Sequence, residues 1–160
     1  MRTLGKKGVS PLIATVLLIA FAVALGAVVM NWGKTQIQDN INAGTECKDM
    51  EFSWFMRGGK PVLCYTPESI EITVQNGPLM EVEGIKMIVD GSKEIYTAES
   101  ITAERIGKAE AKKITANYDT EKYGEPRVIK LFPKVTRNEK SIICPIEKSV
   151  VYENIPKCTE

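Results

Sequence analysis

The sequence predicts an α+β protein in which a long, hydrophobic N-terminal α-helix precedes an antiparallel β-sandwich head. Two observations carry this prediction. No charged residue occurs from Val9 to Met30, and nearly every side chain in that run is aliphatic. After Gly44 the pattern changes to short segments of alternating polar and apolar residues, separated by turn residues. The expected organisation is a basic leader at 1–8, a helix at 9–44 and an extracellular head at 45–160.

The hydrophobic helix is expected to begin just after Gly8. Ser10 stands directly before Pro11, and this order is typical of a helix start. The hydroxyl can accept bonds from the free amides of the first turn, and proline fits the first helical position. At ~1.5 Å per residue the uncharged run extends roughly 33 Å, enough to cross the hydrocarbon core of a membrane.

The flanking charges predict the orientation of this helix. Arg2, Lys6 and Lys7 precede the run, and the next basic residue is Lys34. Because basic residues favour the cytoplasmic side, the N-terminus is expected in the cytoplasm and the head outside it. Trp32, close to Lys34, suits the outer membrane–water interface.

The head is expected to contain seven to nine short strands, a pattern typical of an antiparallel sandwich. Met50–Phe55 and Pro61–Tyr65 are expected to pair as a hairpin around Gly58-Gly59. Ala98–Lys113 is expected to be a loop with a short helical turn. The remaining strands are expected at 69–75, 82–89, 94–97, 113–118, 127–132, 141–145 and 150–153.

All four cysteines, Cys47, Cys64, Cys144 and Cys158, follow the hydrophobic run. An even number in a small exported domain predicts two disulfides. Three pairings are possible, and we favour Cys47–Cys64 with Cys144–Cys158, because each closes a short loop around an expected hairpin. A zinc site is not expected, because the spacings are wide and the chain has no histidine.

The composition argues against an enzyme and against nucleic-acid binding. Without histidine the commonest general base is missing, and the cysteines are better used as disulfides. We therefore expect no catalytic residue, no bound metal and no cofactor. Beyond the three basic residues before the run, 18 basic side chains stand against 20 acidic ones, interspersed along the chain. No basic patch for a nucleic acid is expected.

The hydrophobic run itself has three interpretations: an uncleaved membrane anchor, a secretory signal, or the assembly helix of a filament subunit. Ala22-Val23-Ala24 offers a small-residue cleavage pattern of the secretory kind. Against it, the apolar run continues to Met30, and no polar region precedes the cut.

The stretch Lys6-Lys7-Gly8-Val9-Ser10-Pro11-Leu12-Ile13-Ala14-Thr15-Val16-Leu17-Leu18 resembles the N-terminus of archaeal type IV pilins. The resemblance implies a class III signal peptide that a prepilin peptidase cuts between Gly8 and Val9, with Lys6 and Lys7 as the basic leader residues. The helix is then kept and followed by a β-rich head. Bacterial pilins carry Glu at the fifth mature position, which here is Ile13, so assembly would rest on apolar packing.

The resemblance implies a prepilin that waits in the cell membrane, with its N-terminus in the cytoplasm. A pilus assembly ATPase and a membrane platform would then draw it into an extracellular homo-oligomeric filament, joined through the helix and used for adhesion. An archaellin-like subunit is ranked lower, because archaellin helices usually open with Gly- and Ala-rich sequence. The alternatives from other classes are a membrane-anchored β-sandwich that binds a sugar or solute, and a secreted enzyme.

Overall fold

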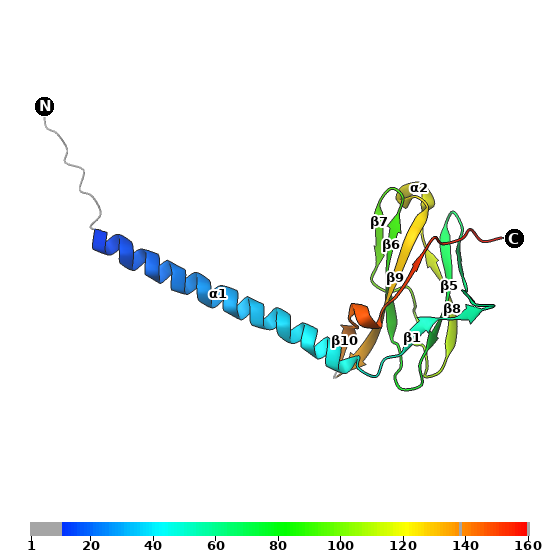
Figure 1. The fold of residues 1–160 in the computed structure, drawn as a ribbon, viewed down its shortest axis with the longest axis horizontal. Helices are drawn as coiled ribbons and strands as arrows, with labels where there is room; N and C mark the ends of the chain where they lie inside the picture. Colours follow the sequence, from blue (N-terminus) through cyan, green and yellow to red (C-terminus); the bar gives the residue numbers. More distant parts are fainter. Residues whose placement is uncertain (1–10, 138, 160) are drawn as a thin grey trace, which may run out of the picture. The chain divides into compact units, whose positions relative to one another are not determined.

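The computed structural model describes residues 11–137 and 139–159, except for the side chains of 11–12 and 35–43. The chain divides into two units, residues 1–41 and 42–160 (Figure 1). Helix α1 (Pro11–Glu46) has 36 residues, which at ~1.5 Å per residue gives a length of about 54 Å. It continues two residues beyond Gly44, the end expected from the sequence.

The first sheet of the head has four antiparallel strands centred on β5. One edge of β5 pairs with β8 along its length, and the other edge pairs with β1 and β4 in turn. Its strands are β1 (Phe52–Trp54), β4 (Leu63–Tyr65), β5 (Ser69–Asn76) and β8 (Ala111–Asn117).

The second sheet has five antiparallel strands centred on β6 and β9. β9 pairs with β6 along one edge and with both β10 and β11 along the other, and β7 pairs with the outer edge of β6. Its strands are β6 (Gly84–Gly91), β7 (Ile95–Ala98), β9 (Pro126–Arg137), β10 (Lys140–Ile143) and β11 (Val150–Glu153).

In each sheet, two short strands therefore lie end to end along the same neighbour: β1 and β4 along β5, and β10 and β11 along β9. Between β1 and β4 the chain forms a separate hairpin of β2 (Met56–Arg57) and β3 (Lys60–Pro61). Its turn is Gly58-Gly59, at φ 58° and 78°, a conformation that favours glycine. Between β10 and β11 the chain forms the short 3₁₀ helix η1 (Ile146–Lys148).

This arrangement corrects the expected hairpin of 50–55 with 61–65. The Gly58-Gly59 turn is present, but the strands on either side of it both hydrogen-bond to β5. The Phe55 amide donates to the Thr73 carbonyl at 3.0 Å, and the Thr73 amide donates to the Val62 carbonyl at 2.8 Å. The two segments are consecutive parts of one edge, because the β2–β3 hairpin is inserted between them.

Side chains from both sheets fill one hydrophobic core. Alternate residues along the strands are buried, as expected for antiparallel sheets with one covered face. The residues that the central strands contribute are Ile70, Ile72 and Val74 from β5, Ile85, Met87 and Val89 from β6, and Ile129, Leu131 and Val135 from β9. The α+β class, with a long apolar helix before antiparallel sheets, is thereby confirmed.

Two further segments differ from the sequence prediction. The connection from Ala98 to Ala111 contains no helical turn; instead Ile106 is fully buried and forms a β-bridge with Val82. A short helix that the sequence reading missed, α2 (Thr120–Tyr123), follows β8. Asp119 caps it, because one carboxylate oxygen accepts bonds from the second and third amides that follow, at 2.8 and 3.2 Å.

Candidate functional site

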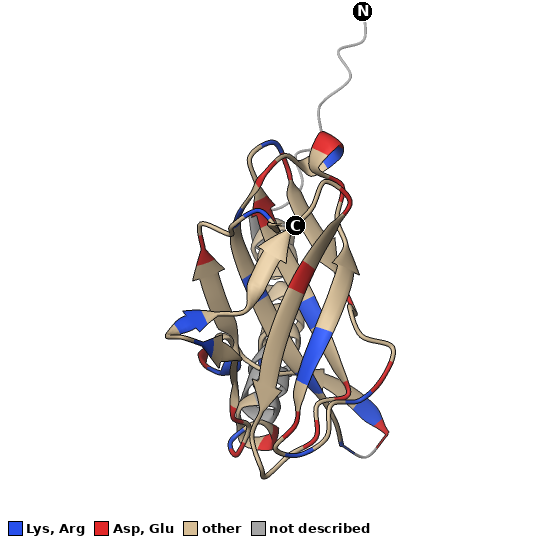
Figure 2. Ribbon diagram, turned by 90° about the vertical axis from the view of Figure 1, so that its right-hand side faces the viewer, with Lys and Arg blue, Asp and Glu red and all other residues tan. Residues whose placement is uncertain are grey.

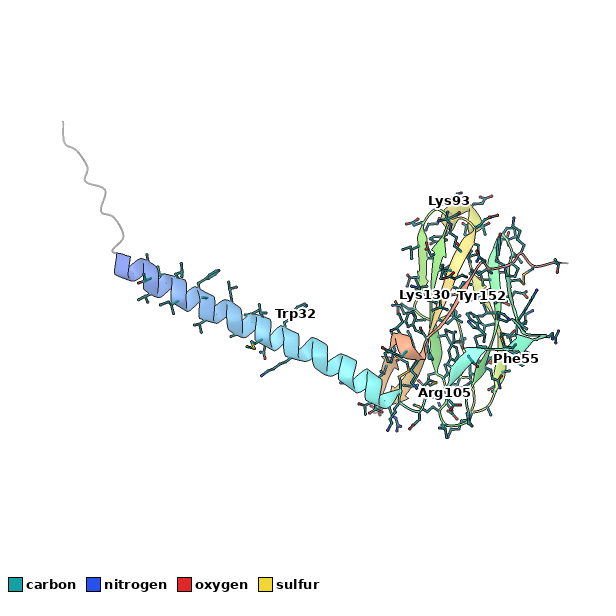
Figure 3. All side chains as sticks on the ribbon, in the orientation of Figure 1. Trp32, Phe55, Lys93, Arg105, Lys130 and Tyr152 are labelled. Carbon is teal, nitrogen blue, oxygen red and sulfur yellow. A yellow bond between two sulfur atoms is a disulfide. The ribbon has the colours of Figure 1, made fainter. Side chains whose placement is uncertain are left out.

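The most unusual surface of the molecule is that of helix α1. The span Ile13–Lys34 is long and apolar enough to cross a membrane, and none of it is buried within the chain. Side chains project from all sides of the helix, with Trp32 near the end of the span (Figure 3). The large apolar side chains that are exposed on it are Ile13, Val16, Leu17, Leu18, Ile19, Phe21, Val23, Leu25, Val28, Val29, Met30 and Trp32.

This exposure sets the chemistry of the helix. Burying one fully exposed large apolar side chain contributes about 1.5–3 kcal/mol, and these side chains are about half to two-thirds exposed, so burying the full set contributes about 11–23 kcal/mol. Water is therefore a poor environment for α1, and lipid or the apolar surface of another helix is a good one. Trp32 and Lys34 end the span with the residue types found at membrane interfaces. The expected processing residues, Lys6, Lys7, Gly8 and Val9, lie outside the described residues.

The first disulfide joins Cys47, directly after α1, to Cys144, directly after β10. Both residues are almost fully buried, and their Cα atoms lie 5.7 Å apart. The favoured pairing of Cys47 with Cys64 is therefore wrong. It assumed that the strands beside these two cysteines face each other as a hairpin, whereas β1 and β4 lie end to end along β5.

We call the residues that join residues 46–50 to the second sheet the neck: Glu46, Cys47, Arg137, Cys144 and Lys148. The Arg137 guanidinium pairs with the Glu46 carboxylate at 3.0 Å. The Lys148 ammonium donates to the carbonyls of residues 48 and 50, at 2.7 and 3.1 Å. The neck thus combines a buried covalent link, an ion pair and two charge-assisted hydrogen bonds.

The second disulfide joins Cys64, in β4, to Cys158, in the C-terminal segment. The favoured pairing of Cys144 with Cys158 is wrong for the same reason, because β10 and β11 lie end to end along β9. A Glu71 carboxylate oxygen lies within 4.8 Å of both sulfur atoms. The two sulfurs are bonded to each other and so are not thiolate ligands for a metal ion.

The end of the head that carries α2 is built around tyrosines. The Tyr118 hydroxyl is buried and donates to the Gly124 carbonyl at 2.8 Å. Its ring meets those of Tyr96 and Tyr123, with centroids 5.6 and 5.7 Å away. Burial, followed by the charge of Asp90, raises the pKa of Tyr118 to about 12. This hydroxyl therefore stays protonated at neutral pH and acts as a structural donor.

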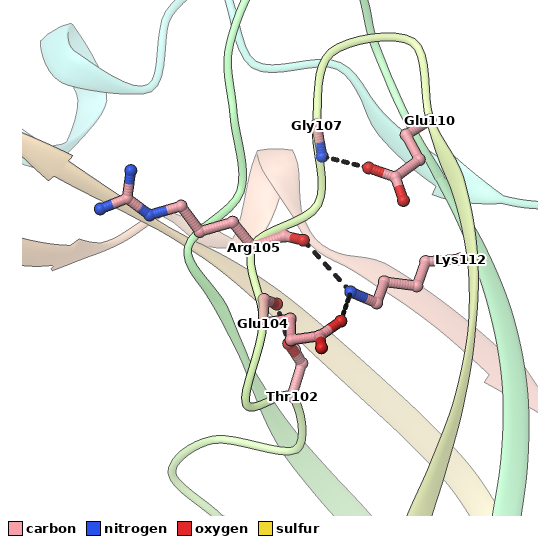
Figure 4. Close-up of polar contacts among 6 residues, drawn as sticks. All are labelled: Thr102, Glu104, Arg105, Gly107, Glu110 and Lys112. Atoms are coloured by element: carbon pink, nitrogen blue, oxygen red, sulfur yellow. Dashed lines mark hydrogen bonds and ion pairs between the residues drawn. The ribbon is translucent and has the colours of Figure 1, made fainter.

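The long connection from β7 to β8 is fixed by side chains at its own ends (Figure 4). The Lys112 ammonium bonds the Glu104 carboxylate at 2.9 Å and the Arg105 carbonyl at 3.2 Å. This lysine lowers the pKa of Glu104. The Gly107 amide donates to the Glu110 carboxylate at 2.5 Å.

Asn76 joins the same connection to the end of β5. Its side-chain amide is buried and donates to the carbonyls of Met80 and Gly107, at 2.7 and 2.9 Å. Asn76 is not identified from the sequence, where it directly follows the strand expected at 69–75. Because asparagine before glycine is common in turns, the sequence alone does not indicate that this side chain hydrogen-bonds the β7–β8 connection.

The charges on the head do not form a single-sign surface in the view of Figure 2, where basic and acidic residues are interspersed over strands and turns. Several are paired across neighbouring strands and loops. The Lys86 ammonium lies 2.7 Å from Glu99, and the hydrogen bond between them lowers the pKa of Glu99. The Lys157 ammonium lies 3.0 Å from Glu125 and lowers the pKa of that carboxyl.

No protein-family model, no curated protein and no solved structure matches this chain.

Proposed function

We propose that this chain is a structural subunit, a pilin, of an archaeal type IV pilus-like surface filament. The observation that carries the proposal is the surface of α1, where every large apolar side chain from Ile13 to Trp32 is exposed. Such a helix needs an apolar environment outside its own chain. A membrane supplies it before assembly, and the helices of other copies supply it within a filament.

On this proposal, a prepilin peptidase removes residues 1–8 between Gly8 and Val9, while the helix lies in the cell membrane. An assembly ATPase and a membrane platform then transfer the subunit into the filament. Exchanging lipid for protein keeps the apolar surface of α1 buried throughout, so α1 never bears the cost of about 11–23 kcal/mol that exposure to water would impose. The head is exposed outside the cell and serves adhesion; its role is not catalytic.

Two features of the head support an extracellular position and a sandwich architecture. Both disulfides suit an oxidising compartment outside the cytoplasm. The two sheets share one core, and Trp54 of β1 meets β11 of the other sheet. Its ring lies 6.2 Å from that of Tyr152, and its indole donates to the Val151 carbonyl at 3.3 Å. We propose that the sheets are the two layers of a β-sandwich.

The decisive measurement is the N-terminal residue of the native protein, together with electron microscopy of sheared cell surfaces. A mature protein that begins at Val9 and is recovered in filaments supports the proposal. Gly8→Phe should block both the cut and filament formation, because the resemblance implies a small residue before the cut. Gly5→Phe is the matched control and should be processed normally. A protein that begins at Val9 but stays monomeric in the membrane would refute the filament proposal.

The second candidate is a single-pass membrane-anchored binding domain. It is favoured by Trp32 and Lys34, which end the span as interfacial residues do in a permanent anchor. On this alternative the native protein keeps Met1 and is never found in filaments. A plain secretory signal would instead leave Leu25 as the first residue.

A further inference from the structure

The outer face of the four-stranded sheet carries a groove with a volume of about 430 Å³. Its floor is formed by side chains of β5 and β8 that point away from the core, and its wall by the segment that leads into the β2–β3 hairpin. The residues that matter for its chemistry are Phe55, Arg57, Val62, Glu71, Thr73 and Lys113. None of the residues that line this groove belongs to α1 or to the neck.

The floor of the groove is polar and nearly neutral. Thr73 and Lys113 are direct cross-strand partners, so their side chains lie on the same face. Lys113 also pairs with Glu71 at 2.7 Å, which neutralises the carboxylate of the groove. Within the described residues the Thr73 hydroxyl has no hydrogen-bond partner, and it is only half-buried, so it can bind a ligand.

The wall of the groove is aromatic and basic. Phe55 is half-buried where the β2–β3 hairpin leaves the sheet (Figure 3). The segment 52–62 contains Arg57 and Lys60 and no acidic residue. Both side chains are exposed, and Arg57 forms no ion pair with any residue that the structure describes. A Cβ placed on Gly58 or Gly59 would have no atom within 4 Å, so the turn of the hairpin does not pack against another segment.

We propose that this groove binds an acidic saccharide, a sugar unit that carries a carboxylate. The Arg57 guanidinium would bind the carboxylate, and the Thr73 hydroxyl would bond a sugar hydroxyl. The apolar face of the sugar ring would lie against Phe55. A nucleic acid fits less well, because its backbone charge calls for a longer basic track than this hairpin offers. The proposal rests on the proposed function only for display of the head outside the cell.

The test is isothermal titration calorimetry of the full chain in detergent micelles, with trigalacturonate as the acidic probe. Maltotriose is the uncharged control trisaccharide, and a short oligothymidylate represents a nucleic acid. Trigalacturonate should bind, and its affinity should fall as ionic strength rises, because the attraction is screened by salt. Arg57→Gln should weaken binding about tenfold, equivalent to about 1.4 kcal/mol, and Thr73→Val should weaken it less.

Arg127→Gln is the matched control, because Arg127 is also an exposed strand arginine but does not line the groove. It should bind trigalacturonate as the wild type does. The proposal is overturned by equal affinity for maltotriose, by an equal loss in the two arginine variants, by tighter binding of oligothymidylate, or by no binding at millimolar probe. Filament assembly is scored separately. If the wild-type protein forms filaments that do not bind trigalacturonate, the groove proposal alone is refuted. If the chain binds trigalacturonate but never assembles, the filament proposal alone is refuted.

Discussion

Removal of the Cys64–Cys158 disulfide offers a quantitative test of how the head is stabilised. The variant Cys64→Ser with Cys158→Ser replaces two half-buried sulfurs and leaves the buried Cys47–Cys144 bond in place. Because the two disulfides overlap along the chain, the loop closed by the second bond is much shorter than the 94 residues between its cysteines. The expected loss of stability must be calculated with the first bond intact.

The effective loop runs through the remaining disulfide. Cys64 lies 17 residues after Cys47, and Cys158 lies 14 residues after Cys144, so the closed path has about 31 residues. In the chain-entropy model such a loop contributes about 3.7 kcal/mol, compared with about 4.7 kcal/mol for a loop of about 100 residues. We expect the free energy of unfolding to fall by about 3.7 kcal/mol.

The assay is guanidinium unfolding of the full chain in detergent, followed by near-ultraviolet circular dichroism of the head. With a denaturant slope of about 4 kcal/mol per molar, the midpoint should fall by about 1 M. A fall of less than about 0.25 M would refute the reasoning. Thiol counting provides the control. The Cys47→Ala, Cys144→Ala variant should have no free thiol, whereas Cys47→Ala with Cys64→Ala should expose two.

Three further predictions concern single side chains. Tyr118→Phe should lower stability by about 1–2 kcal/mol in chemical unfolding, because a buried hydrogen bond is lost. The pKa of Tyr118 is raised to about 12 in the folded state, above its unfolded value near 10. The stability that this shift supplies is therefore complete below pH 10 and is lost as pH rises towards 12, and the Phe variant should lack this dependence. Asn76→Ala should cost about 1–3 kcal/mol, because the partly buried carbonyls of Met80 and Gly107 lose their donor; the exposed Asn117→Ala is the control and should change stability by less than about 0.5 kcal/mol. Val23→Arg should raise the free energy of membrane insertion by about 3 kcal/mol relative to the Val23→Leu control in an insertion assay, and an unchanged insertion free energy would contradict a membrane-embedded α1.

The helix and the longest strands could be predicted because each has a strong local signal. An uncharged run of this length has few alternatives to a helix. Strand β5 (Ser69–Asn76) could be predicted, apart from its last residue, because Ile70, Ile72 and Val74 alternate with polar residues. Helix α2 was missed, although Asp119 before it and Gly124 after it are ordinary helix-boundary residues. A single turn is too short to produce a periodic pattern.

The strand pairing and the disulfides could not be predicted, because alternation identifies a strand and not its neighbour. Two short strands on either side of a Gly-Gly turn are normally read as a hairpin. Here the turn belongs to the small β2–β3 hairpin, and the flanking strands share the edge of β5. Both disulfide errors follow from this assumption, made once for the strands beside Cys47 and Cys64 and once for those beside Cys144 and Cys158. Likewise, the groove could not be predicted, because it depends on the register that places Lys113 beside Thr73.

The overlapping disulfides also determine how the head responds to tension. The sequence separates Cys47 from Cys158 by 111 residues, which could extend to about 370 Å if the chain were pulled straight. Through the Cys47–Cys144 bond, the covalent path contains only the 14 residues from Cys144 to Cys158, a limit of about 50 Å. A load applied between Cys47 and Cys158 therefore cannot stretch residues 64–144, even after the hydrogen bonds of the sheets have broken. The distance between these two cysteines can reach only about 50 Å before the covalent backbone and the disulfide bear the load.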